Sequence, residues 1–179
     1  MGTAFVYHSK DKDDVNQGIN LMKLSMESFE QLIAGSHISC IFVLVNAYLV
    51  AGFYDEGISV CEQAIVTMEK YKIDGMCGRG ELYRLLALLL WKKGKKTNEI
   101  NLVYIESLLN KAVEENQKLE LKFMELKTWN VFAEILLDGL QLEITRSKVT
   151  EQLQQLVNVI ETNESSLIVQ NSIGYIQSL

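Results

Sequence analysis

The stretch from Ala47 to Ala64 reads AYLVAGFYDEGISVCEQA and contains the clearest folding signal of the chain. An apolar segment that ends near Tyr48 is followed by Gly52, and a second periodic segment begins soon after it. Glycine favours such a turn because it has no Cβ and adopts conformations that other residues avoid. Gly57 and Ala64 then recur seven positions apart in the second segment. This spacing predicts two antiparallel helices that cross closely at small side chains.

The hairpin resembles a tetratricopeptide repeat, a helix–turn–helix unit that stacks with its neighbours into a solenoid. The resemblance rests on small and aromatic residues at the expected helix crossings and turns, namely Gly18, Tyr48, Gly52, Tyr54, Gly57, Ala64, Gly94 and Ala112. Gly18 to Gly57 is a period of 39 residues, above the usual ~34. The repeats are therefore degenerate. If Gly94 corresponds to Gly52, the third hairpin has an insertion of about six residues in its turn or a second helix that starts later.

Apolar residues at steps of three and four predict helices along most of the chain. The expected ranges are 15–33, 36–51, 55–72, 80–93, 98–119, 121–138 and 147–161, with a weaker helix at 165–178 and a helix tail at 1–8. Gly35 and Ser36 are expected to close one helix and begin the next. We therefore predict an all-α domain over residues 1–179, a right-handed solenoid of eight or nine helices. Its repeat units are 1–35, 36–74, 78–119 and 121–161, with a capping helix at 163–179.

Composition excludes several classes of function. The 179 residues include no proline, 48% of them are hydrophobic, and the net charge is −6. An acidic chain is a poor platform for nucleic acid, which needs clustered positive charge. The apolar run 38–51 is too short to span a membrane. Three cysteines without a CxxC pair, and no signal peptide, predict a reducing cytoplasm.

No catalytic or metal-binding pattern stands out. His8 and His37 are isolated, and Cys40 is the one potential ligand at helical spacing from His37. The glycine-rich run 75–80 lacks the Gly-Lys-Ser/Thr ending of a phosphate loop. We therefore predict no enzyme activity, no cofactor and no metal.

The lysines around Gly94 and the two tryptophans can each be interpreted as either structural or ligand-binding residues. The lysines around Gly94 are either an anion or membrane contact, or cations at a helix C-terminus, and we favour the latter. Trp91 and Trp129 are interpreted as packing residues.

In repeats of this kind the first helix of each hairpin lines a binding groove. The resemblance places Phe42, Asn46 and Leu49 there in the second unit, and Glu81, Arg84 and Leu88 in the third, as exposed positions. Asn130, in the fourth unit, is a further candidate. A carboxamide can donate to and accept from a peptide backbone at once, so Asn46 and Asn130 are candidate peptide contacts. The alternative is that each is an incidental polar residue. The cationic clamp that some of these repeats use for chaperone C-termini is absent.

Two segments narrow the resemblance, ELYRLLALLL (81–90) and YIESLLNKAVEENQKLELKFMELKTW (104–129). They are similar to the C-terminal repeat region of bacterial adenylate/guanylate cyclases and of LuxR-type regulators with a signalling-ATPase module. The resemblance implies a non-catalytic sensor or scaffold part of a signalling regulator that binds a protein or peptide. The alternative function is a self-associating scaffold that forms a homodimer through an apolar end, motivated by residues 1–8 and 165–178.

Overall fold

The computed structural model describes residues 12–29, 34–70, 78–160 and 167–179. Within these ranges the chain forms eight helices and no strand, which confirms the all-α prediction. The helix tail expected at residues 1–8 lies outside them. The helices are α2 (Lys12–Phe29), α3 (Ala34–Ala51), α4 (Tyr54–Lys70), α5 (Arg79–Thr97), α6 (Leu102–Lys118), α7 (Lys122–Leu137), α8 (Arg146–Val159) and α9 (Leu167–Ser178).

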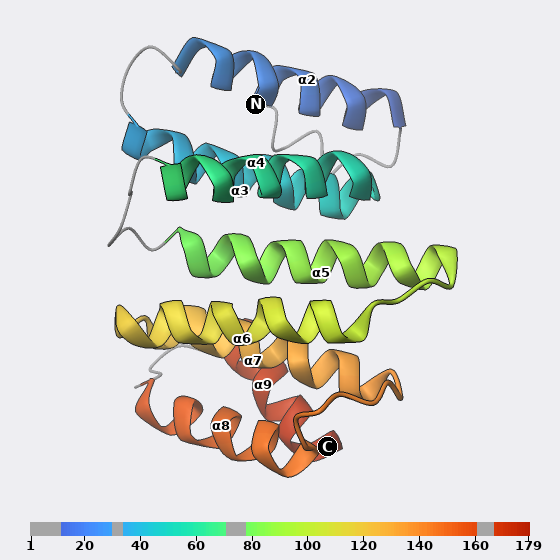
Figure 1. Ribbon diagram of the computed structural model, residues 1–179, viewed down its shortest axis with the longest axis vertical. Helices are drawn as coiled ribbons and strands as arrows, with labels where there is room; N and C mark the ends of the chain where they lie inside the picture. Colours follow the sequence, from blue (N-terminus) through green and yellow to red (C-terminus); the bar gives the residue numbers. More distant parts are fainter. Residues whose placement is uncertain (1–11, 30–33, 71–77, 161–166) are drawn as a thin grey trace.

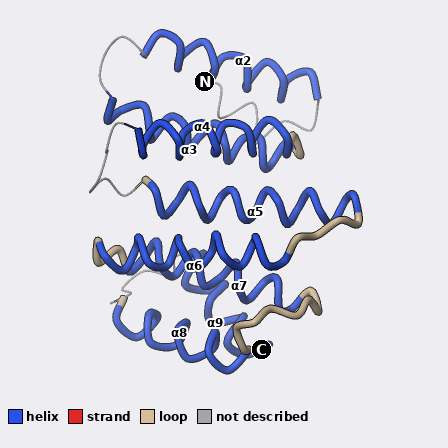
Figure 2. Tube along the Cα trace, viewed as in Figure 1, coloured by secondary structure: helices blue, strands red, loops and turns tan. Residues whose placement is uncertain are grey.

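The helices are stacked along the long axis of the molecule, from α2 at one end to α8 and α9 at the other (Figure 1). Each helix packs against the next one along the chain. In addition α3 contacts α5, α5 contacts α7, and α7 contacts α9. We call α3, α5, α7 and α9 the odd-helix layer. Short links join the successive helices α3 to α4, α5 to α6 and α6 to α7 (Figure 2).

Local chemistry explains several helix ends. Asn101 and Thr145 precede α6 and α8, and their side chains accept hydrogen bonds from the backbone N–H groups of Tyr104 and Lys148. Such caps satisfy donors that have no partner inside the helix. Gly52, after α3, and Gly139, after α7, have φ angles of +76° and +82°. Both are positions where a side chain would be strained.

The main core runs through the stack from α3 to α9. Its largest fully buried side chains include Trp91, Phe132 and several leucines of α5. Trp129 is also buried, with its ring centroid 5.0 Å from that of Phe132. The two tryptophans are thus packing residues, as expected. A second, smaller cluster joins α2 to α3 and consists of Ile19, Leu44, Ala47 and Tyr48.

Close packing at small residues is clearest at Gly57 in α4. A Cβ added there would lie 2.9 Å from a methyl group of Leu89 in α5 and 3.3 Å from Cβ of Tyr48 in α3. Three helices therefore meet at this glycine. Gly18, Ala64 and Ala112 are also buried, whereas Tyr54 is half-buried against the main core.

Gly94 has a different role from the one expected. It lies inside α5, which continues to Thr97, and the chain turns at Asn98, whose φ is +58°. The N–H groups of Asn98 and Glu99 both bond to the carbonyl oxygen of Gly94. Helix α6 then begins at Leu102, four residues later than predicted, so the second helix of this hairpin starts late.

The prediction for Gly35 and Ser36 was also wrong. Both residues belong to α3, which begins at Ala34, so neither forms the link before it. The periodic pattern located the helices, but it did not resolve their ends because a glycine is tolerated within a helix when packing supports it.

Candidate partner-binding face

Helix α3 is the least polar part of the odd-helix layer. It contains no Asp, Glu, Lys or Arg. Val43 and Val50 are 39% and 56% exposed, and Phe42 and Leu49 are half-buried against the main core. We call Phe42, Val43, Asn46, Leu49 and Val50 the α3 strip. Single exposed apolar residues are common, but here they lie on a helix with no formal charge to solvate its surface.

Asn46 is the polar member of the α3 strip. Its Nδ2 donates to the carbonyl oxygen of Phe42, one turn earlier, over 2.7 Å. Its amide oxygen has no partner among the described residues. That oxygen is therefore the group with which Asn46 could accept a hydrogen bond from a bound chain.

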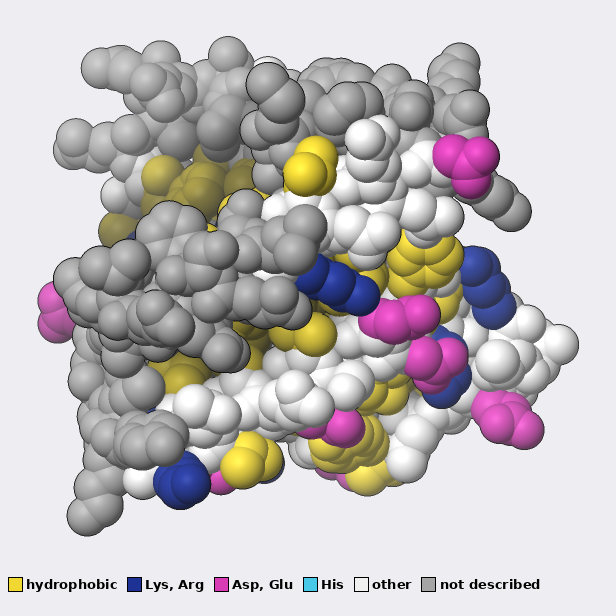
Figure 3. Space-filling view, turned by 90° about the horizontal axis from the view of Figure 1, so that it is seen from above, with side chains coloured by type: hydrophobic (Ala, Val, Ile, Leu, Met, Phe, Trp, Pro, Cys, Tyr) yellow, Lys and Arg dark blue, Asp and Glu magenta, His cyan; other side chains and the backbone are white. Residues whose placement is uncertain are grey.

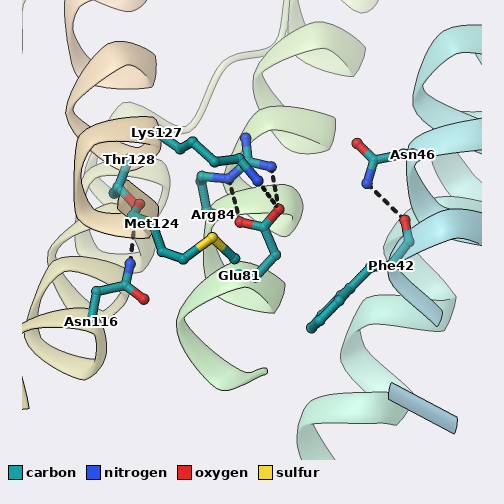
Figure 4. A network of polar contacts seen from close by, with 8 residues as sticks. All are labelled: Phe42, Asn46, Glu81, Arg84, Asn116, Met124, Lys127 and Thr128. Atoms are coloured by element: carbon teal, nitrogen blue, oxygen red, sulfur yellow. Dashed lines mark hydrogen bonds and ion pairs between the residues drawn. The ribbon is translucent and has the colours of Figure 1, made fainter. Parts of the chain in front are cut away.

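A cluster of charged residues lies where α5 meets α7, and α5 also contacts α3, the helix of the α3 strip (Figure 4). The guanidinium of Arg84 donates to both carboxylate oxygens of Glu81, each over 2.7 Å. Lys127, from α7, donates to the same carboxylate over 2.6 Å. Glu81 and Arg84 are buried, and the Lys127 side chain is 23% exposed. We call Glu81, Arg84 and Lys127 the α5–α7 triad.

The triad holds one carboxylate between two cations. Burial raises the pKa of Glu81, but hydrogen bonds and charge from Arg84 and Lys127 outweigh it, so the pKa lies below its ordinary value. Because an Arg–carboxylate fork fixes two parallel hydrogen bonds, the Glu81–Arg84 pair has a defined geometry. Glu81 is thus an anion at neutral pH, and the triad has a net charge of about +1.

The lysines around Gly94 all have partners within the chain. Lys92 lies 3.9 Å from Glu134, Lys95 lies 2.5 Å from Asp138, and Lys93 lies 2.5 Å from Asp55. Lys96 stands 4.5 Å from the centroid of the Tyr54 ring. Dark-blue and magenta side chains lie side by side at one edge of the molecule in Figure 3. Three of these lysines thus neutralise acidic side chains of neighbouring segments, and the fourth lies over an aromatic ring. These contacts support the interpretation of the lysines as cations near a helix C-terminus rather than as an anion site.

Asn130 lies in the contact between α7 and α9. Its Oδ1 accepts a hydrogen bond from Ser172 over 2.8 Å, and its Nδ2 donates to the carbonyl oxygen of Ile168 over 3.3 Å. The residue is buried. Nearby, Tyr175 donates to Glu134 over 2.8 Å, and burial together with this carboxylate raises the tyrosine's pKa. Asn130 therefore holds α9 in place, with both ends of its carboxamide in use.

The structure brings five of the six candidate contact residues to α3 and α5, two helices in contact. Phe42, Asn46 and Leu49 lie on α3, and Arg84 and Leu88 lie on α5. The expectation that Glu81 and Arg84 are exposed is wrong. Both side chains are buried, because they pair with each other and Glu81 also pairs with Lys127. Their spacing of three along a helix could have suggested the pair. No local signal pointed to Lys127, which lies 46 residues from Glu81.

The described residues offer few candidates for other types of site. No group of three or more His, Cys, Asp or Glu side chains is placed to hold a metal ion there. None of the helices in those ranges combines the length and apolar character needed to cross a membrane. Cys61 is a buried free thiol whose pKa is raised to about 12, by burial first and then by the charge of Glu62. A pocket of about 200 Å³ lies at the α5–α6 link and contains Gly94 and Tyr104.

The apolar residues of α9 are largely accounted for by contacts within the chain. Ile168, Val169, Tyr175 and Ile176, together with Leu179 directly after the helix, belong to the main core or pack against it, whereas Ile173 is exposed. Most outward residues of α8 are polar. This end of the described stack therefore presents little apolar surface for a second copy.

Comparison with protein-family models finds none that matches this chain, and comparison with curated proteins finds no match either.

Proposed function

We propose that this chain is a non-catalytic helical-repeat module that binds a protein or peptide on its odd-helix layer. The observation that carries the proposal is the α3 strip, an apolar surface on a helix without formal charge. Exposed apolar patches on folded proteins commonly mark sites of interaction. Arg84 and Leu88 would extend this surface onto α5.

The proposed architecture is a right-handed, tetratricopeptide-like solenoid. Two features support it: contacts restricted to neighbouring and next-but-one helices, and small residues such as Gly57 where helices cross. The similarity of segments 81–90 and 104–129 to regulator-associated repeats supports a role as the sensor or scaffold part of a signalling regulator. Free thiols at Cys40 and Cys61 fit the reducing environment of the cytoplasm.

The test selects a dodecapeptide from a random phage-displayed library against the immobilised protein, then measures its affinity by calorimetry. We expect Val43→Asp combined with Val50→Asp to weaken binding at least about tenfold, because each carboxylate would be desolvated on binding. The matched control combines Val66→Asp and Val103→Asp, at valines that are 62% and 75% exposed on α4 and α6. The control should keep wild-type affinity.

Three results would overturn the proposal. The selection could enrich no peptide, the double variant of α3 could bind as tightly as the wild type, or the control could lose affinity equally. Circular dichroism of both variants establishes that they are folded before affinities are compared. Sedimentation of the free protein tests the alternative, since a dimer that Val43→Asp dissociates would assign the strip to self-association.

A further inference from the structure

We propose that the odd-helix layer selects a partner segment that combines apolar side chains with an Asp or Glu side chain. The apolar side chains would cover the α3 strip, and the carboxylate would bind Lys127 at the edge of the α5–α7 triad. This inference rests on the proposed function and names the chemistry of the partner.

The requirement for apolar side chains comes from α3. Burial of exposed apolar surface is favourable whatever the sequence of the partner, so the strip alone would bind apolar segments without choosing among them. Asn46 adds one acceptor for a backbone N–H within the strip. Selectivity must therefore come from the neighbouring helices.

The requirement for a carboxylate comes from the charge of the triad. Glu81 is the one acidic residue within ion-pair distance of Arg84 or Lys127 among the described residues. Two cations thus share a single anion, in a chain whose overall charge is −6. Lys127 has three N–H donors, and one contact is to Glu81. Because the Lys127 side chain is partly exposed, its remaining N–H groups can donate to a second carboxylate.

The other lysines at the α5–α7 contact differ in this respect. Lys92 pairs with Glu134 of α7, and Lys95 pairs with Asp138, which directly follows α7, so those pairs are neutral. Among the described ion pairs between α5 and α7 or its C-cap, the triad is the one with more cations than anions. In Figure 4 Arg84 and Lys127 converge on Glu81, and the adjacent helix carries Phe42 and Asn46. A segment that crosses from α3 to α7 would meet apolar surface first and the cation second.

Charge also argues against other occupants. In a symmetric dimer the same face meets itself, which brings two positively charged triads into one interface. A nucleic acid would need many cations rather than one. A protein segment with an isolated acidic side chain matches a single excess charge on a layer whose other α5–α7 ion pairs are neutral.

The experiment uses three acetylated, amidated decapeptides, so that side chains supply all the charge. Each probe has leucines separated by Ser and Gly, and two positions carry Asp, Asn or Lys. Calorimetry at physiological salt should show the Asp probe binding about fivefold more tightly than the Asn probe, the upper end for a partly exposed ion pair. The Lys probe should bind most weakly.

The matched variants are Lys127→Gln and Lys148→Gln, which remove the same charge from α7 and from α8. Lys148 is exposed and pairs with Glu151 within its own helix. We expect Lys127→Gln to bind the Asp and Asn probes equally, and Lys148→Gln to keep the fivefold preference. Measured with the Asn probe, each variant should match the wild type, which separates loss of selectivity from loss of folding.

Equal affinity of the wild type for the Asp and Asn probes would overturn the inference, as would a preference that survives Lys127→Gln. If the Asn probe binds as tightly as the Asp probe and Val43→Asp abolishes that binding, the proposed function stands and the preference for an acidic side chain is wrong. If none of the probes binds and the selected dodecapeptide does not depend on Val43 and Val50 either, both proposals fail together.

Discussion

At the scale of single residues, Gly94 and Gly174 show how the same substitution can have opposite effects. Both glycines lie within helices, α5 and α9. A Cβ on Gly94 would lie 2.7 Å from the backbone oxygen of Glu99 and 2.8 Å from a side-chain carbon of Ile100. A Cβ on Gly174 would meet nothing within 4 Å. Tertiary packing, and not helix propensity, therefore decides which glycine is required.

We predict that Gly94→Ala lowers the free energy of unfolding by about 2 kcal/mol, because the returning link cannot move away from α5 without cost. Gly174→Ala should raise it by about 0.5–1 kcal/mol through helix propensity alone. Urea denaturation of both variants measures the difference. Similar destabilisation by the two substitutions would show that the α5–α6 turn is not closely packed around Gly94.

At the scale of elements, two buried carboxylates connect helices that are distant in sequence. Glu106 in α6 accepts hydrogen bonds from the backbone N–H groups of Glu143 and Ile144, each over 2.8 Å, and so holds the α7–α8 link. Glu81 in α5 binds Lys127 of α7. Charged acceptors make stronger hydrogen bonds than neutral ones, so each carboxylate is an anchor between elements.

Removal of the Glu106 anchor should loosen the α7–α8 link. We predict that Glu106→Ala lowers the free energy of unfolding by about 2–3 kcal/mol, since two backbone N–H groups lose a charged partner. Hydrogen exchange at the amides of residues 143 and 144 should become faster. Glu106→Gln keeps one carbonyl acceptor and should show a smaller effect. Unchanged exchange at these amides in Glu106→Ala would contradict the assignment.

The Glu81 anchor should make stability depend on pH. The pKa of this carboxyl group in the folded chain lies below its ordinary value of 4.5. Its contribution is therefore fully present above pH 4.5 and is lost as the pH falls below that value through the folded pKa. We predict that the stability difference between wild type and Glu81→Gln shrinks as the pH is lowered from 6 to 3.

Glu151→Gln serves as the control for this pH series. Glu151 is an exposed residue of α8, 3.5 Å from Lys148, and exposed pairs contribute little. Its stability difference from wild type should stay small at every pH. A constant difference for Glu81→Gln across the same range would show that Glu81 is not held as an anion by Arg84 and Lys127.

At the scale of the whole molecule, the described helices touch only their neighbours and next-but-one neighbours. Stability in such a stack is distributed along its length, because no contact between the described helices joins one end to the other. The main core is richest in α5, α6 and α7, whereas the small cluster of Ile19, Leu44, Ala47 and Tyr48 joins α2 to α3. Among the described helices α2 contacts α3 alone, whereas α8 and α9 contact each other and α7.

We predict that native-state hydrogen exchange is slowest in α5–α7 and fastest in α2, because α2 contacts a single described helix and therefore opens locally at lower cost. Mass spectrometry of peptides from each helix measures this order. Destabilisation by Gly94→Ala should accelerate exchange in the central helices. Uniform protection from α2 to α9 would show instead that the stack unfolds as one cooperative unit.

The sequence by itself determined that the described chain is helical and where most helices lie, because apolar periodicity and turn glycines such as Gly52 and Gly139 act over a few residues. It did not locate the end of α5, since Gly94 is tolerated inside a helix. The Glu81–Arg84 pair was within reach of local reasoning, at a spacing of three.

Only the tertiary structure decided which polar residues face solvent. Lys127 lies 46 residues from Glu81, and Ser172 lies 42 residues from Asn130, so neither pairing leaves a local pattern in the chain. Because of these contacts Asn130 is buried, and one excess cation remains at the contact between α5 and α7. Helix formation depends on near neighbours, whereas the burial and charge of a binding face depend on how distant helices meet.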